Sequence, residues 1–170
     1  LYITELESFS NGVLYTLELE QPVSSDPYDE LLDRKYLGYF YVVDEMIYYL
    51  PAEKDGYTDA DNNRVIEQIK SDEADFLEQC MIVCCEKGTE DITDDNGYHA
   101  YVEVDGDKRI FRYYNDYFYG SKEYMLMVWE KGQGITYYIH GNGAKNMHVE
   151  FGSHIKEKQK VDYGYPYKIL

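Results

Sequence analysis

The chain has 170 residues, and its 33 Asp and Glu against 16 Lys and Arg give a formal net charge of −17. This length suits one domain with a substantial core, so we expect residues 1 to 170 to form a single domain. An acidic field repels phosphate, which excludes nucleic acid and favours cations, basic proteins or neutral ligands such as sugars. No run of about 18 apolar residues occurs, so the sequence predicts no transmembrane segment.

The first 50 residues predict two β-hairpins. Asn11-Gly12 separates two alternating runs, and this dipeptide is a strong signal for a tight hairpin turn. A short segment with some helical character, residues 26 to 34, follows the first hairpin. Residues 36 to 50 then predict the second hairpin, which turns at Asp44-Glu45.

Residues 58 to 80 carry the sustained helical pattern of the chain. Val65, Ile66 and Ile69 fall on one helical face, with a break expected at Ser71. Thr58 or Asp59 is expected to cap the first turn by accepting hydrogen bonds from its free amides.

The start of this segment also resembles part of a calcium-binding loop. Asp59, Asp61 and Asn63 place oxygen side chains at alternate positions, but Arg64 and Lys70 stand where such a loop needs glycine and a bidentate glutamate. Helix capping therefore explains these residues better, and we expect no cofactor.

Three cysteines, Cys80, Cys84 and Cys85, lie within six residues. They form neither a CxxC pair nor a spaced disulfide framework. Because they stand among aliphatic residues, we expect them to be small buried hydrophobic residues of a strand.

Residues 81 to 151 predict a β-meander of successive hairpins. One hairpin turns at Asp105-Gly106, and a second turns at residues 131 to 134. In the second, a four-residue loop would pair Trp129 with Thr136, Met127 with Tyr138 and Met125 with His140. The more apolar face is expected to form the core side. That face carries Tyr124, Leu126, Val128, Ile135, Tyr137 and Ile139.

These elements predict an α+β fold, in which an antiparallel β-sheet built of consecutive hairpins is covered by the helical segment. We divide the chain into hairpins at 1 to 50, the helical segment at 58 to 80, the meander at 81 to 151 and a basic C-terminal segment at 152 to 170. We expect roughly eight or more strands with consecutive hairpins paired, and nothing in the sequence excludes two sheets.

Tyrosine is the most unusual feature of the composition, with 21 tyrosines against 6 phenylalanines and 1 tryptophan. Exposed tyrosines suit sugar stacking or protein contact because each presents an apolar ring and a hydroxyl, although tyrosine is also an ordinary strand residue. The candidate ligand-binding residues are Tyr113, Tyr114, Tyr117, Tyr119, Trp129 and Tyr138.

A metal site is a further hypothesis. His140, His148 and Glu150 would share one face if His140 pairs with His148, and two imidazoles with a carboxylate can hold zinc and a reactive water. Polar residues on the solvent side of a strand explain the same pattern. No nucleophile motif such as GxSxG is present, and we expect no catalytic residues and no enzyme.

The segments 101 to 114 and 128 to 144 resemble a group of uncharacterised secreted or lipid-anchored proteins from Gram-positive gut bacteria. The matching pattern is a tryptophan strand, a glycine turn, a tyrosine strand and a GxGA-like loop. Its residues are Trp129, Gly132, Gly134, Tyr137, Tyr138, Gly141, Gly143 and Ala144. The resemblance implies an extracellular or cell-envelope location, with any signal sequence or tether upstream of Leu1, and implies no activity.

Two functions follow as hypotheses. The first is a non-catalytic extracytoplasmic domain of the bacterial cell surface that binds a carbohydrate, a peptide or another partner. The second is an acidic cytoplasmic inhibitor, such as an immunity protein or nucleic-acid mimic, that covers a basic protein surface. The aromatic excess favours the first, and the net charge favours the second.

Overall fold

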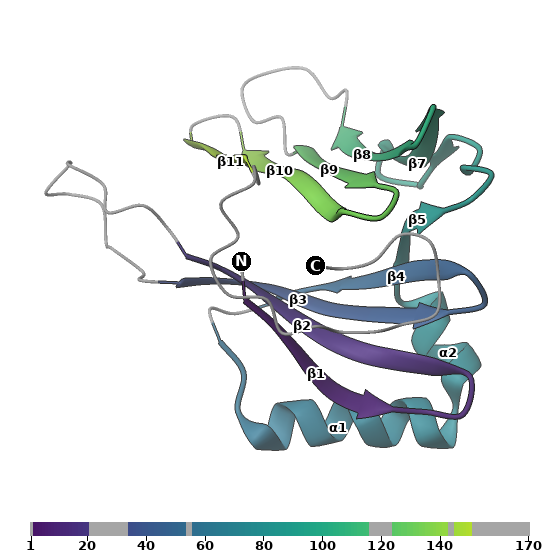
Figure 1. Ribbon diagram of the computed structural model, residues 1–170, viewed down its shortest axis with the longest axis vertical. Helices are drawn as coiled ribbons and strands as arrows, with labels where there is room; N and C mark the ends of the chain where they lie inside the picture. Colours follow the sequence, from purple (N-terminus) through teal and green to yellow (C-terminus); the bar gives the residue numbers. More distant parts are fainter. Residues whose placement is uncertain (1, 21–33, 54–55, 116–123, 143–144, 151–170) are drawn as a thin grey trace, which may run out of the picture.

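A computed structural model describes residues 2–20, 34–53, 56–115, 124–142 and 145–150. Within these residues the fold is α+β, as the sequence predicts, with two antiparallel sheets and two short helices (Figure 1). The expected helix within residues 26 to 34 lies almost wholly outside the described residues.

The first sheet has five strands that pair in chain order. Its strands are β1 (Tyr2–Ser8), β2 (Gly12–Glu20), β3 (Arg34–Val43), β4 (Met46–Pro51) and β5 (Met81–Cys85). The predicted turn between β3 and β4 is confirmed. Asp44 and Glu45 both have positive φ, 50° and 64°, which is the backbone that a two-residue hairpin turn requires.

The helical segment consists of α1 (Asp59–Ser71) and α2 (Glu73–Glu78), with the break at Asp72. Thr58 is the N-cap, as expected. Its hydroxyl accepts from the amide of Asp61 at 3.3 Å, while a carboxylate oxygen of Asp61 accepts from the amide of Thr58 at 2.8 Å. The predicted apolar face of α1 and Phe76 of α2 pack against Tyr39, Tyr41 and other side chains of the first sheet.

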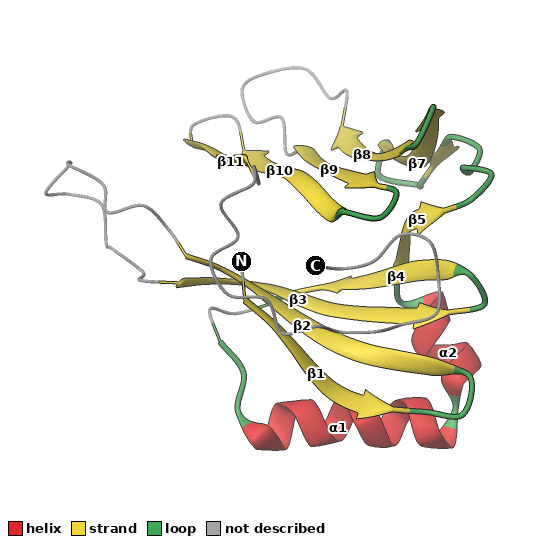
Figure 2. Ribbon diagram, in the orientation of Figure 1, coloured by secondary structure: helices red, strands yellow, loops and turns green. Residues whose placement is uncertain are grey.

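The second sheet has six strands. They are β6 (Ile92–Thr93), β7 (Tyr98–Asp105), β8 (Lys108–Asn115), β9 (Tyr124–Glu130), β10 (Gly134–Asn142) and β11 (Lys145–Glu150). The helices lie on one side of the first sheet and the second sheet lies on the other (Figure 2). The result is three layers in the order helix, sheet, sheet.

Side chains from both sheets form one buried cluster between them. The Phe40 and Trp129 rings meet edge to face with centroids 6.0 Å apart. Tyr49 of the first sheet and Tyr138 of the second are both buried in the same cluster. Aromatic contacts therefore hold the two sheets face to face.

The predicted core side of the β9–β10 hairpin is wrong except at Ile135, which is buried as expected. Met125, Met127 and Trp129 are buried, whereas the alternate residues of β9 are only half-buried. Met127 pairs with Tyr138 and Met125 with His140 as expected, but an irregularity between Ile135 and Tyr137 pairs Trp129 with Ile135. Both faces of β9 carry apolar or aromatic side chains, so apolar character alone does not identify the buried face.

Two of the three cysteines, Cys84 and Cys85, are buried strand residues as expected, whereas Cys80 precedes the strand. Cys84 and Cys85 are buried in β5, and Cys80 is partly buried after α2; all three are free thiols. Burial raises the pKa of Cys80 to about 12, because removal from water disfavours the thiolate. None of the helices in the described ranges is long and apolar enough to cross a membrane.

Candidate functional site

The candidate site is the face of the second sheet that points away from the first sheet. Pairing across β7, β8 and β9 builds it from cross-strand rows, because directly opposed residues share a face. One row is Tyr101, Arg112 and Leu126, and the next is His99, Tyr114 and Tyr124. We call these six residues, together with Glu103, the tyrosine face.

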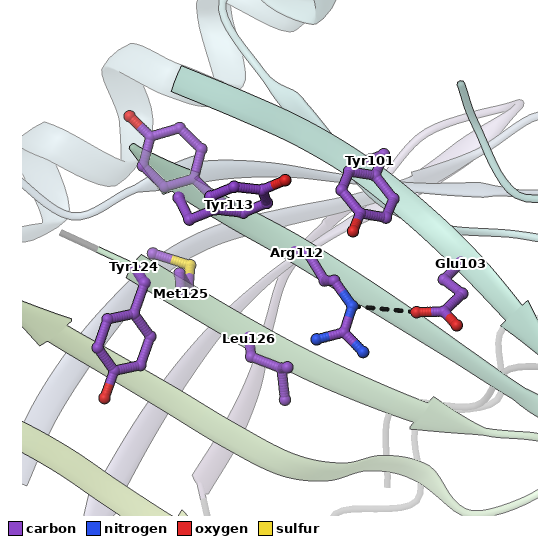
Figure 3. A pocket seen from close by; sticks show the side chains of 8 residues that line it. Tyr101, Glu103, Arg112, Tyr113, Tyr124, Met125 and Leu126 are labelled. Atoms are coloured by element: carbon purple, nitrogen blue, oxygen red, sulfur yellow. Dashed lines mark hydrogen bonds and ion pairs between the residues drawn. The ribbon is translucent and has the colours of Figure 1, made fainter. Parts of the chain in front are cut away.

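A groove of about 480 Å³ opens on the tyrosine face (Figure 3). This volume falls within the range of small-molecule sites, roughly 300–1,000 Å³. Three adjacent strands contribute its walls. The lining residues are Tyr101, Glu103, Arg112, Tyr113, Tyr114, Tyr124, Met125 and Leu126.

An ion pair lies at the rim of this groove. The Arg112 Nε donates to a carboxylate oxygen of Glu103 at 3.0 Å. Figure 3 shows one terminal guanidinium nitrogen of Arg112 on the side of Leu126 and the other between Leu126 and Glu103. These nitrogens and the second Glu103 oxygen make no hydrogen bond within the described part of the chain, so the pair retains donors and an acceptor for a ligand.

A second polar group supports the aromatic side chains from the β6 side. The His99 Nδ1 lies 3.0 Å from a carboxylate oxygen of Asp91 and 3.3 Å from the hydroxyl of Thr93. Its ring stacks on Tyr114 at 4.8 Å with an interplanar angle of 4°. Tyr101 then meets Tyr114 edge to face at 6.4 Å. These contacts restrict the orientation of Tyr114, which favours a preorganised surface.

The chemistry of the tyrosine face suits binding. Tyrosine rings present apolar surface, while their hydroxyls and the Glu103–Arg112 pair offer directional hydrogen bonds at the edge. Within the ranges that the structure describes, no group of three His, Cys, Asp or Glu side chains is arranged to hold a metal ion.

The aromatic residues predicted as ligand-binding separate into three sets. Tyr113 and Tyr114 border the groove, but only Tyr114 belongs to the tyrosine face, because Tyr113 packs against the core between the sheets. Trp129 and Tyr138 are 0% and 1% exposed, which corrects the expectation that they lie at the surface. They are buried because the second sheet packs on the first through this face. Tyr117 and Tyr119 lie outside the described residues.

The pairing assumed for the metal hypothesis is wrong by one residue. β10 continues to Asn142 and β11 begins at Lys145, so the connection is shorter than the expected seven-residue loop. His140 pairs with Met147, while His148 pairs with Ile139 and Glu150 with Tyr137. This register removes the His140–His148 pairing on which a shared zinc site depended.

Sequence reasoning missed Tyr101, Glu103, Arg112, Tyr124 and Leu126 as members of one surface. The alternation of β9 predicts its two faces, but it places Tyr124 and Leu126 on the core side. The sequence does contain a signal for the exposed face of β9. A tyrosine hydroxyl can stay hydrated at the surface, whereas Met125 and Met127 on the other face have no polar end.

No family model, curated protein or solved structure matches this chain.

Proposed function

We propose that this protein is a non-catalytic binding module that holds a neutral saccharide on the tyrosine face. The observation that carries the proposal is the groove lined by Tyr101, Tyr114 and Tyr124, with the Glu103–Arg112 ion pair at its rim. A pyranose ring has apolar C–H faces and a hydroxyl edge, so it requires both kinds of contact at once.

The net charge of −17 supports a neutral ligand over an anionic one. Repulsion at long range would slow the approach of a sulfated or phosphorylated polymer. A neutral saccharide is unaffected by this field, and its affinity should change little with salt concentration.

The proposed place of action is the bacterial cell surface. Its support is the resemblance of residues 101 to 114 and 128 to 144 to secreted and lipid-anchored proteins, together with a ligand class that is abundant outside cells. Mass spectrometry of the terminal peptide and fractionation of source cells test this location. A processed terminus in the envelope fraction is expected, and an intact methionine terminus in the cytosol would contradict it.

Isothermal titration calorimetry with cellohexaose and mannohexaose tests the binding function. We expect at least one of these neutral probes to bind, and the Tyr124→Ala variant to weaken that binding by about tenfold, or 1.4 kcal/mol. Tyr2→Ala removes a half-buried tyrosine from the edge of the other sheet and is the matched control. Absence of binding to both probes, or equal loss in the two variants, would overturn the proposal.

A basic protein partner is the second candidate function. It is favoured by acidic side chains that are exposed along one continuous part of the molecule, the helical layer. These residues are Asp59, Glu67, Asp72, Asp75 and Glu78. Capture of a basic protein from source cells at low salt, with release at high salt and no saccharide binding, would support this function in place of the first.

A further inference from the structure

We infer that the Glu103–Arg112 ion pair determines which saccharides bind, because it forms hydrogen bonds with two adjacent hydroxyl groups of the sugar. This inference rests on the proposed function, because it assigns the hydroxyl-recognising group within the same groove. It narrows the ligand to neutral sugars that carry hydroxyls on neighbouring ring carbons.

The geometry of the pair leaves complementary atoms beside each other. The Arg112 Nε donates a hydrogen bond to one Glu103 oxygen at 3.0 Å, and this contact orients the two side chains relative to each other. The other Glu103 oxygen is an acceptor, and the terminal nitrogens of Arg112 are donors. One sugar hydroxyl can donate to Glu103 while its neighbour accepts from Arg112, so both hydroxyls are satisfied by a single charged pair.

The surroundings of the pair favour this role over a purely structural one. Its side chains retain 37% and 47% exposure for Arg112 and Glu103, so the pair contributes little to stability in water. Leu126, the cross-strand partner of Arg112, provides an apolar neighbour on the side of one terminal nitrogen. Contact with a ring there would exclude water and strengthen the hydrogen bonds of the pair.

Two probes distinguish binding that requires adjacent hydroxyls from binding by ring stacking alone. Cellohexaose has neighbouring hydroxyls at carbons 2 and 3 of each ring, whereas chitohexaose has the same backbone with an acetamido group at carbon 2. We expect the protein to bind cellohexaose at least tenfold more tightly than chitohexaose. We expect Arg112→Ala and Glu103→Ala to reduce this ratio to near one.

Conservative and matched variants show whether hydrogen bonding causes the preference for cellohexaose over chitohexaose. Glu103→Gln keeps a carbonyl acceptor and should retain part of the preference. Arg64→Ala removes an exposed arginine of α1 and should leave the preference unchanged. Urea denaturation of each variant checks that the fold is intact.

The outcomes distinguish this inference from the proposed function. Binding of cellohexaose that depends on Tyr124 but shows no preference over chitohexaose, or a preference that survives in Arg112→Ala, would overturn the inference alone. Failure of cellohexaose, mannohexaose and chitohexaose alike to bind, or binding that is independent of Tyr124, would overturn the inference and the proposed function together.

Discussion

The Arg109 side chain, which originates in the second sheet, donates from Nε to the backbone carbonyl of Cys85 in the first sheet at 3.1 Å. The same nitrogen lies 2.8 Å from the carbonyl of Glu86, and Nη1 donates to the carbonyls of Gly106 and Lys108 at 2.9 and 2.8 Å. Arg109 is only 5% exposed. One buried cation therefore joins the end of β5 to the β7–β8 turn, and this contact helps to set the orientation of the sheet that carries the tyrosine face.

Replacement of Arg109 by alanine should destabilise the protein by about 3 kcal/mol, because it leaves buried carbonyl groups without donors. Urea denaturation measures this loss. Lys108→Ala, a change at the exposed neighbour, should alter the free energy of unfolding by no more than about 0.5 kcal/mol. Similar stability of the two variants would show that Arg109 does not connect the sheets.

Trp129 and Tyr124, on opposite faces of β9, should respond differently to truncation. Trp129→Ala creates a cavity between the sheets and should cost about 3–5 kcal/mol. Tyr124→Ala should change stability by less than about 1 kcal/mol while weakening saccharide binding. Thermal and urea denaturation of both variants check this assignment of faces, and a larger stability loss for Tyr124→Ala would contradict it.

The capping box of α1 predicts a modest effect on stability. Thr58→Ala removes the acceptor for the Asp61 amide and should lower the free energy of unfolding by about 1 kcal/mol. Thr58→Ser keeps a hydroxyl and should retain most of the stability. Equal losses for the serine and alanine variants, measured by urea denaturation, would rule out the hydrogen bond as the cause.

Alkaline pH should destabilise the folded state through buried thiols and phenols. Burial raises the pKa of Cys80 and of Tyr39 to about 12, from ordinary values of 9.0 and 10.0. The folded protein then binds more protons than the unfolded chain, so the free energy of unfolding should decrease as pH rises from 9 towards 12. Urea denaturation across this window measures the slope.

Cys80→Ala is the matched variant for the pH experiment. It removes one of the groups that releases a proton on unfolding, so its stability should depend less steeply on pH above 9 than that of the wild type. An unchanged slope would exclude Cys80 as a contributor. The native thiols should also react slowly with a thiol reagent near neutral pH, because burial keeps them protonated.

Local signals in the sequence predicted much of the fold. Asn11-Gly12, Asp44-Glu45 and Asp105-Gly106 each mark a hairpin turn, and Thr58 marks the start of α1. These features depend on neighbours within a few residues. The sequence could therefore specify them without knowledge of the tertiary structure.

The buried face of the second sheet could not be predicted in the same way. On β9, both faces carry apolar or aromatic residues, and the choice between them depends on Phe40 and other side chains of the first sheet. The strand pairing near His140 depends on the length of a connection that two glycines leave ambiguous. The tyrosine face was missed as a site because its definition requires both the register and the identity of the core face.

The most direct test of saccharide binding by the tyrosine face is a two-dimensional NMR titration of isotope-labelled protein with cellohexaose and mannohexaose. We expect chemical-shift changes centred on Tyr101, Arg112 and Tyr124, with small changes at the buried residues Met127 and Trp129. Changes centred on α1 and α2, or no changes with either probe, would contradict the claim that the tyrosine face binds a neutral saccharide.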